Sequence, residues 1–418
     1  MASTTQLPRA ALANVLAALG DTPVVAINGA RQVGKSTLAQ QVMALTGGQV
    51  VTLDDSPQRD AANADPRGFV ERRIDGPLII DEVQFAPPLF RALKAAVDRD
   101  RRPGRFILTG STRLLSADGF ADALVGRLEV VELWPFTQGE ILGHPDDFVD
   151  RVFDDQPPVQ PIGQLGRGDY LERVVVGGFP EAVARRPDRR GAWFSGYLSA
   201  LTEKLIRDLS GIERIADLPR IIRLCAARSG EELNVTSMAN ELAIPPRTLD
   251  GYLAFLANLF VVQLVPAWST NLSKKVIRRP KIVLVDSGLA AHLTGTTVAR
   301  AADPTTPIGG LVEAFVAMEL RKQASWSGHR PTLSHFRDRD GAEVDLILER
   351  PDGMIVGVEV KASTTVSSRD TRGLRFLADR LGDRFHAGYV LSMMPEPTPL
   401  GPKITALPIE SLWTDSRT

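Results

Sequence analysis

A glycine-rich segment near the start of the chain has the residue types that hold a triphosphate. The run GARQVGKST fits G-x-x-x-x-G-K-[ST], with an apolar strand-like run before it and a helical pattern after it. Glycines let the backbone approach phosphate oxygens closely, so that successive N–H groups surround the anion. Lys35 is expected to reach the β- and γ-phosphates, and Ser36 to ligate Mg²⁺. The nucleotide-binding residues that this motif predicts are Gly29, Ala30, Arg31, Gln32, Val33, Gly34, Lys35, Ser36 and Thr37.

Two adjacent carboxylates, Asp81 and Glu82, follow the apolar run PLII. Asp81 would hold Mg²⁺, usually through water, and Glu82 would polarise the attacking water as a general base. Adjacent carboxylates at a strand end also occur as solvated turns. In a chain that carries the phosphate-binding motif, however, the pair indicates binding and hydrolysis of ATP with Mg²⁺ as a cofactor.

The predicted catalytic set has two more members beside Glu82 and Lys35. In additional-strand ATPases a polar residue after the fourth strand senses the γ-phosphate, and either Ser111 or Thr109 fits that place in the segment TGSTR; the alternative is a hydroxyl-rich turn. Arg127 opens the next strand-like run, where a guanidinium can neutralise transition-state charge, often across a subunit interface. An arginine that works in this way implies a homo-oligomer, whereas the alternative is a surface arginine.

A second group of charged residues lies in the last third of the chain. Glu313 stands on a helical pattern, Asp345 in the strand-like run EVDLIL, and Glu359 and Lys361 in VEVK. Glu359 and Lys361 are two residues apart, so they share one face of a strand. The order resembles the D…ExK pattern of restriction endonucleases, in which carboxylates hold Mg²⁺ and a lysine stabilises charge. The alternatives are an ordinary charged sheet face and a domain of this fold that only binds.

A helix-turn-helix pattern precedes that group. TSMANEL and the run from Arg247 onward predict two helices around Pro245–Pro246, and a hairpin follows as the wing. Clustered positive charge at a hairpin suits contact with DNA phosphates. The alternative is that the region contacts protein, because Asp250 lies beside the one basic residue of the second helix. The predicted DNA contacts are Arg247, Lys274, Lys275, Arg278 and Arg279.

The elements that position these residues alternate between strand and helix, which predicts an α/β fold. Short apolar runs with helical patterns between them favour a mostly parallel sheet, and ligands of such sheets bind beyond the carboxyl ends of the strands. The expected strands of this sheet cover residues 24–28, 49–54, 77–81, 105–110 and 127–133. The predicted organisation is an ATPase domain at 1–145, a linker or ordered loop at 146–168, a helical winged-helix-like region at 169–280 and a small nuclease-like α/β domain at 281–418.

Composition sets outer limits on function. The 418 residues have 44% hydrophobic and 24% charged residues and a net charge of −1, so any basic surface must be local. Cys225 is the single cysteine and lies in an apolar run, which favours a buried structural thiol. Five histidines without paired spacing predict no zinc site. No signal peptide and no apolar stretch of about 18 residues is present, so a cytoplasmic protein without membrane contact is expected.

Taken in order along the chain, these motifs resemble those of bacterial and archaeal AAA-type (AAA_14) P-loop ATPases with a C-terminal DUF4143 domain. The resemblance covers most of the chain, and the order of the motifs makes it specific. It implies an ATPase core, a winged-helix-like middle and a restriction-endonuclease-like end. The runs that carry it are INGARQVGKST, LDD, LIIDEVQ, FILTGS, LVGRLEVVELWPFTQGE, GGFPEAV, KIVLVDSGLAAHL, GGLVEAFVAMEL and HFRDRDGAEVDLILE with GVEVKAS.

Two functional hypotheses follow. In the first, ATP hydrolysis drives a conformational change that acts on DNA through the winged-helix and nuclease-like domains. In the second, the chain is a signalling or scaffold ATPase whose C-terminal domain binds a partner protein and cuts nothing. Stimulation of ATP turnover by DNA, with a steep loss in salt, distinguishes the first from the second.

Overall fold

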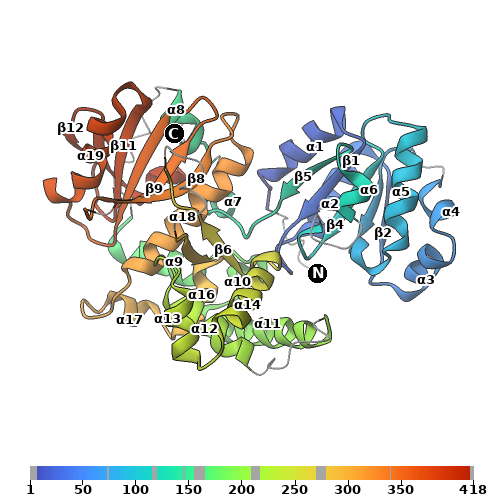
Figure 1. Cartoon of the computed structure of the whole chain (residues 1–418), viewed down its shortest axis with the longest axis horizontal. Coiled ribbons are helices and arrows are strands. Elements are labelled where there is room, and N and C mark those ends of the chain that lie inside the picture. Colours follow the sequence, from blue (N-terminus) through green and yellow to red (C-terminus); the bar gives the residue numbers. More distant parts are fainter. Residues whose placement is uncertain are drawn as a thin grey trace. The chain divides into compact units, whose positions relative to one another are not determined.

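The computed structural model describes residues 7–72, 75–114, 120–144, 146–154, 165–208, 217–269, 279–338 and 340–414. The chain divides into two compact units, coloured along the sequence in Figure 1. Unit 1 comprises Met1–Pro135 with Asn258–Phe260, and unit 2 comprises Phe136–Ala257 with Val261–Thr418. No described helix is long and apolar enough to cross a membrane.

Unit 1 is built on a five-stranded parallel sheet with the strand order β2-β3-β4-β1-β5. Strands β1 and β4 are buried along their whole length, as apolar runs are in a parallel sheet with both faces covered. Because β4 lies between β3 and β1, an additional strand separates the two predicted nucleotide motifs. The predicted α/β sheet with an additional strand is therefore confirmed. The strands are β1 (Val24–Asn28), β2 (Gln49–Thr52), β3 (Leu78–Asp81), β4 (Phe106–Gly110) and β5 (Leu128–Glu132).

The helices of unit 1 pack their apolar sides against this sheet. In α5, Leu89, Leu93 and Val97 are fully buried in one core with Ile80 and Leu108 of the strands, as the spacing of three and four residues in a helix requires. The sequence pattern does not single out α3 and α4, which are short and begin at proline-containing turns. The elements are α1 (Ala11–Asp21), α2 (Lys35–Thr46), α3 (Ser56–Ala64), α4 (Pro66–Val70), α5 (Pro88–Arg99), α6 (Phe120–Leu124) and the 3₁₀ turn η1 (Val83–Phe85).

The first half of unit 2 is helical and contains the predicted helix-turn-helix. Helices α12 (Leu218–Ala227), α13 (Val235–Leu242) and α14 (Pro246–Asn258) precede an antiparallel pair, β6 (Val262–Val265) and β7 (Lys281–Leu284). The side chain of Asn234 caps α13 by accepting from Ser237 N. Cys225 is fully buried in α12. The other helices are α7 (Gln138–Leu142), α8 (Phe148–Phe153), α9 (Arg167–Val176), α10 (Pro180–Ala184), α11 (Pro187–Asp208), α16 (Ser287–Thr294) and α17 (Val298–Ala302).

The second half of unit 2 is a six-stranded mixed sheet with helices. Its strand order is β12-β13-β11-β10-β9-β8, with β8, β9 and β10 antiparallel and β11 parallel to β10. Gly373 starts α19 against β9, where a Cβ would lie 1.7 Å from the carbonyl oxygen of Glu343. The elements are α18 (Gly309–Trp326), β8 (Thr332–Arg337), β9 (Glu343–Glu349), β10 (Ile355–Lys361), η4 (Ser368–Thr371), α19 (Arg372–Leu381), η5 (Gly382–Arg384), β11 (Phe385–Ser392), β12 (Thr398–Gly401), β13 (Ile404–Pro408) and η6 (Ile409–Leu412).

A buried polar network fastens the start of unit 2 to α18. Lys322 Nζ donates to the carbonyl oxygen of Phe136 and to Glu319 Oε1, both at 2.8 Å. Glu319 Oε2 accepts from Gln138 N at 2.9 Å. Burial, together with the charge of Glu319, raises the pKa of Asp146 to about 8. Residues 146–168, predicted as a linker or loop, include α8 in this packed region, while residues 155–164 lie outside the described part of the chain.

Candidate functional site

The phosphate-binding loop joins the end of β1 to the start of α2. Lys35 is 5% exposed, and its Nζ donates to the carbonyl oxygens of Gly29 and Ala30 at 3.0 and 2.9 Å. Gly34 has φ +98°, and the space beside it is open, so its backbone conformation is one that glycine adopts without strain. At Gly29 a Cβ would lie 2.2 Å from the carbonyl oxygen of Leu133. The loop is thus folded around its own lysine.

Asp81 receives hydroxyl groups from two other elements. Ser36 Oγ, at the start of α2, donates to Asp81 Oδ2 at 3.0 Å, and Thr109 Oγ1, in β4, donates to Asp81 Oδ1. Thr109 Oγ1 also accepts from Glu82 N at 3.1 Å. The two predicted metal ligands, 45 residues apart in sequence, are therefore in direct contact. Their meeting follows from the parallel sheet, whose strands end at one edge.

Glu82 and Ser111 are connected through a residue that the sequence reading did not single out. Gln84 Nε2 donates to Glu82 Oε2 and lies 3.4 Å from Ser111 Oγ. Glu82 has φ +56°, a left-handed conformation that is uncommon for residues other than glycine. The two alternatives for the sensor therefore differ in surroundings, because Thr109 contacts Asp81 whereas Ser111 contacts Gln84. The one sequence signal for Gln84 is its position, because it follows Asp81 by three residues and comes just after the carboxylate pair.

Arg127 lies at the opposite edge of the sheet from the phosphate loop. Its carbonyl oxygen accepts from Val24 N at 3.2 Å, whereas the strand end beside Asn28 is Glu132. Five residues of strand separate those positions, which is about 16 Å at 3.3 Å per residue. The Arg127 guanidinium binds Asp98 Oδ1 through Nε at 2.7 Å and Nη2 at 2.6 Å, and this hydrogen bond lowers the pKa of Asp98. The structure does not bring Arg127 to the phosphate loop of its own chain.

An arginine does lie at the carboxyl edge of the sheet. Arg113 Nη1 is 3.3 Å from Glu132 Oε1, and the Arg113 guanidinium carbon lies 4.9 Å from the centre of the Phe260 ring. Arg127, the arginine named above for neutralising transition-state charge, does not lie at this edge. Arg113 lies nearer to the phosphate-binding loop than Arg127 does, because Arg113 follows the end of β4 whereas Arg127 precedes the start of β5.

The four predicted nuclease-like residues lie in unit 2, and two of them, Glu313 and Asp345, contact a lysine outside the predicted set. Lys281 Nζ, on β7, is 2.7 Å from Glu313 Oε1 and 3.3 Å from Asp345 Oδ1. It is also 3.2 Å from Glu343 Oε1. Asp345 Oδ2 accepts from Val360 N at 2.9 Å. On the neighbouring strand β10, Lys361 Nζ is 3.3 Å from Glu359 Oε2.

Charge and burial in this cluster raise the pKa values of Glu313 and Glu359. Burial first, and then the charge of Asp345, raise the pKa of Glu313 to about 8 and that of Glu359 to about 9. Burial opposes the charge of Lys281, but its carboxylate neighbours outweigh it and raise its pKa. Among the described residues, no group of three or more His, Cys, Asp or Glu side chains is arranged to hold a metal ion.

The predicted DNA contacts are partly visible. Arg247 is exposed at the start of α14, next to exposed Asp250, and Arg279 is exposed before β7. The other exposed positions on that face of α14 include Gly251 and Ala254, so the face has balanced charge. Lys274, Lys275 and Arg278 lie outside the described residues.

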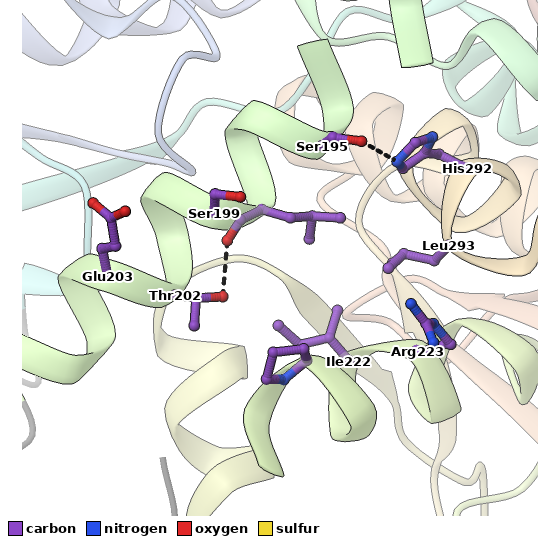
Figure 2. A pocket seen from close by; sticks show the side chains of 10 residues that line it. Ser195, Ser199, Thr202, Glu203, Ile222, Arg223, His292 and Leu293 are labelled. Carbon is purple, nitrogen blue, oxygen red and sulfur yellow. Dashed lines mark hydrogen bonds between the residues drawn. The ribbon is translucent and has the colours of Figure 1, made fainter. Parts of the chain in front are cut away.

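A pocket of about 450 Å³ lies elsewhere in unit 2, between α11, α12 and α16. Ser195 Oγ is 3.2 Å from His292 Nε2 at one side, while Glu203 points away from that pair (Figure 2). Burial alone lowers the pKa of His292. Among the described residues, no carboxylate forms a hydrogen bond with His292, as the residue that orients a catalytic histidine would.

Comparisons with family models match three successive stretches. An AAA domain (AAA_14) matches residues 21–142, a domain of unknown function (DUF8612) matches residues 167–300, and a second one (DUF4143) matches residues 308–412. These matches define an AAA-type P-loop ATPase with a C-terminal DUF4143 domain, and they confirm the resemblance seen in the sequence. ATP is accordingly its nucleotide.

Two mycobacterial proteins are similar over most of the chain. Uncharacterized protein Mb2031c of Mycobacterium bovis and uncharacterized protein Rv2008c of Mycobacterium tuberculosis are each 30% identical over 367 residues, 87% of this chain and 76% of theirs. The chain belongs to the family of these two proteins. Among solved structures, the Walker-type ATPase PABY2304 of Pyrococcus abyssi is similar with a TM-score of 0.43 and 16% identity, over 68% of this chain and 94% of that one. The Thermotoga maritima RuvB Holliday junction branch migration motor has a TM-score of 0.30 and 16% identity, over 62% and 90%.

Proposed function

We propose that this ATPase hydrolyses ATP with Mg²⁺ at the phosphate-binding loop and uses the reaction to act on DNA. The observation that carries the first part is the contact between Ser36 Oγ and Asp81 Oδ2, which lie 3.0 Å apart at the carboxyl edge of the sheet. A hydroxyl and a carboxylate at one point are oxygen donors of the kind that a hard cation prefers. When bound, Mg²⁺ would offset the negative charge of the phosphates.

The residues around that pair have separate roles in this proposal. Lys35 would turn to the phosphate oxygens of ATP from the carbonyl oxygens of Gly29 and Ala30, which accept its hydrogen bonds in this structure. Glu82 would orient and deprotonate the attacking water. Gln84 would hold Glu82 and link it to Ser111, which senses the γ-phosphate.

The active form would be a homo-oligomer in which Arg127 reaches a neighbour's nucleotide. Support comes from its position at the edge of the sheet remote from its own phosphate loop. Mixing Arg127→Ala protein with Glu82→Gln protein tests this, since each lacks a different part of one shared site. We expect turnover in the mixture to exceed the sum of the two alone, whereas an Arg127→Ala protein with unchanged turnover contradicts the role.

The DNA part rests on the helix-turn-helix layout of α12, α13 and α14 with the hairpin β6–β7. In such a layout the start of the last helix and the hairpin meet the nucleic acid. Arg247 and Arg279 are exposed at these two places, and Lys274, Lys275 and Arg278 add positive charge to the same hairpin in sequence. Contacts of this kind are made with phosphates and weaken as salt increases.

The deciding experiment is ATP turnover with and without single-stranded, duplex and branched DNA at a series of salt concentrations. We expect DNA to increase the rate several-fold and the increase to vanish with salt. Arg247→Glu should reduce the increase, while Arg380→Glu, an exposed arginine on α19, should leave it unchanged. Absence of stimulation by every nucleic acid would overturn this part.

The second candidate function is a signalling or scaffold ATPase that binds a partner protein. The charge balance of the exposed α14 face, with Asp250 beside Arg247 and uncharged Gly251 and Ala254, favours it. In that case no nucleic acid would change the rate, and Arg247→Glu would behave like Arg380→Glu.

The proposal also gives the DUF4143 domain a restriction-endonuclease-like fold. The element order α18, β8, β9, β10, α19, β11 supports it, because it places Asp345 and the Glu359–Lys361 pair on adjacent strands and Glu313 on the preceding helix. Whether the domain can cut nucleic acid then depends on whether a divalent metal ion can bind among these side chains.

A further inference from the structure

Three carboxylates of the nuclease-like cluster converge on one ammonium group. Lys281 Nζ is within 3.3 Å of oxygens from Glu313, Glu343 and Asp345, and its side chain is 3% exposed. The ammonium group donates hydrogen bonds to Glu313 and Asp345 and forms an ion pair with Glu343. The centre of the cluster therefore already contains a cation supplied by the chain.

Two further oxygens of the cluster are also engaged. Asp345 directs Oδ1 to Lys281 and Oδ2 to the backbone N–H of Val360, at 2.9 Å. Glu359 Oε2 accepts from Lys361. A divalent ion that shared these oxygens would lie a few ångströms from a buried ammonium group, where Coulomb repulsion between like charges is strong.

The backbone of Lys281 is held firmly in place. It pairs with Val265 across the hairpin β6–β7 and forms a bridge with Glu232. Its neighbours are also fixed, because Leu233 N donates to the Pro280 carbonyl oxygen at 2.7 Å and Ile282 N donates to the Glu231 carbonyl oxygen at 3.0 Å. The ammonium group thus lies in the stretch that matches DUF8612, residues 167–300, whereas the three carboxylates lie in the stretch that matches DUF4143, residues 308–412.

We infer that Lys281 takes the place of the divalent cation in the nuclease-like cluster, so that this site binds no catalytic metal and instead joins β7 to the C-terminal domain. The inference rests on the nuclease-like arrangement proposed above. It predicts that the domain does not cut nucleic acid at this site. It also predicts that the acids form a metal site once the lysine is removed.

The test is a titration of the full-length protein with Mn²⁺ in the absence of nucleotide. The electron paramagnetic resonance signal of free Mn²⁺ measures how much has bound. Wild type and Asp345→Asn should give the same isotherm, because no metal binds at the cluster. Lys281→Met should bind one additional Mn²⁺ per chain, and Lys281→Met/Asp345→Asn should lose it. Lys361→Met is the matched control, since it removes an ammonium group of the same cluster but leaves Lys281 in place, and it should bind no additional Mn²⁺.

Two results would overturn the inference. One is Mn²⁺ binding by the wild type that Asp345→Asn abolishes, which decides the question even if Lys281 variants do not fold. The other is a folded Lys281→Met or Lys281→Gln protein without additional Mn²⁺. Stimulation of ATP turnover by DNA is measured separately, so a failure of the DNA proposal does not affect this result.

Discussion

The two acidic sites of this protein differ in what neutralises their carboxylates. In unit 1, Asp81 accepts from two hydroxyl groups, Ser36 and Thr109, which carry no charge. In unit 2, Asp345 faces the ammonium group of Lys281. Hydroxyl partners leave the negative charge available to an external cation, whereas a buried ammonium group compensates it from within the chain. We therefore expect the carboxylate at the end of β3 to accept an external metal ion, as proposed above, whereas Lys281 already neutralises the carboxylates of unit 2.

The largest expected effect is on ATP turnover when Lys35 is replaced. Lys35→Ala should lower the rate about a thousandfold, because a preorganised cation at the phosphates is lost. Phosphate release and binding of a fluorescent ATP analogue measure the effect. Lys94→Ala is the control, since Lys94 is exposed and pairs with Asp98 near the other edge of the sheet. If Lys35→Ala retains wild-type turnover, the site in unit 1 is not where ATP is hydrolysed, and the comparison with unit 2 fails.

Replacing Glu82 should separate binding from reaction. Glu82→Gln is expected to bind ATP normally but to turn it over about a hundredfold more slowly, because the general base is removed while the loop stays intact. Single-turnover kinetics with radiolabelled ATP measure this. A wild-type rate would show that Glu82 is not the base.

Removing the internal cation should destabilise unit 2. Lys281→Met is expected to cost about 3 kcal/mol, because it leaves buried carboxylates without their partner. Lys361→Met should cost less, since Lys361 is 34% exposed. Urea unfolding followed by tryptophan fluorescence measures both. Recovery of stability by Mn²⁺ in Lys281→Met but not in Lys361→Met would sharpen the contrast between the two sites.

The smallest effect, taken per pH unit, is a pH dependence of stability that comes from the cluster. Glu313 and Glu359 have folded pKa values of about 8 and about 9, above the ordinary value of 4.5. The folded state therefore binds more protons than the unfolded state between about pH 5 and 9, and stability falls as pH rises through that range. Each extra proton contributes up to about 1.4 kcal/mol per pH unit. Melting temperatures from pH 5 to 9 should decline less steeply in Glu313→Gln, and an equal slope would contradict the shift.

Local motifs made the nucleotide site readable from the sequence. The phosphate-binding loop is contiguous, and the parallel sheet places Asp81 beside Ser36 because both follow strand ends. Arg127 was harder to place, since its distance from the loop depends on which end of β5 it occupies. Gln84 acts through contacts that no motif records.

The second cluster was only partly predictable for a different reason. Glu313, Asp345, Glu359 and Lys361 share a recognisable order, and the structure brings them together. Lys281 is 64 residues from Asp345 and reads as part of a basic hairpin. Its burial depends on how β7 packs beside α18 and β9, which residue spacing does not reveal.

The two glycines of the phosphate-binding loop resist replacement for unrelated reasons. Gly29 leaves no volume for a side chain beside Leu133, while Gly34 has room but needs a positive φ. An alanine at position 29 would push the end of β5 outward, whereas an alanine at position 34 would strain a single peptide unit. The same motif letter therefore reflects a requirement for space beside a backbone carbonyl group at the first position and a requirement for a positive φ at the second.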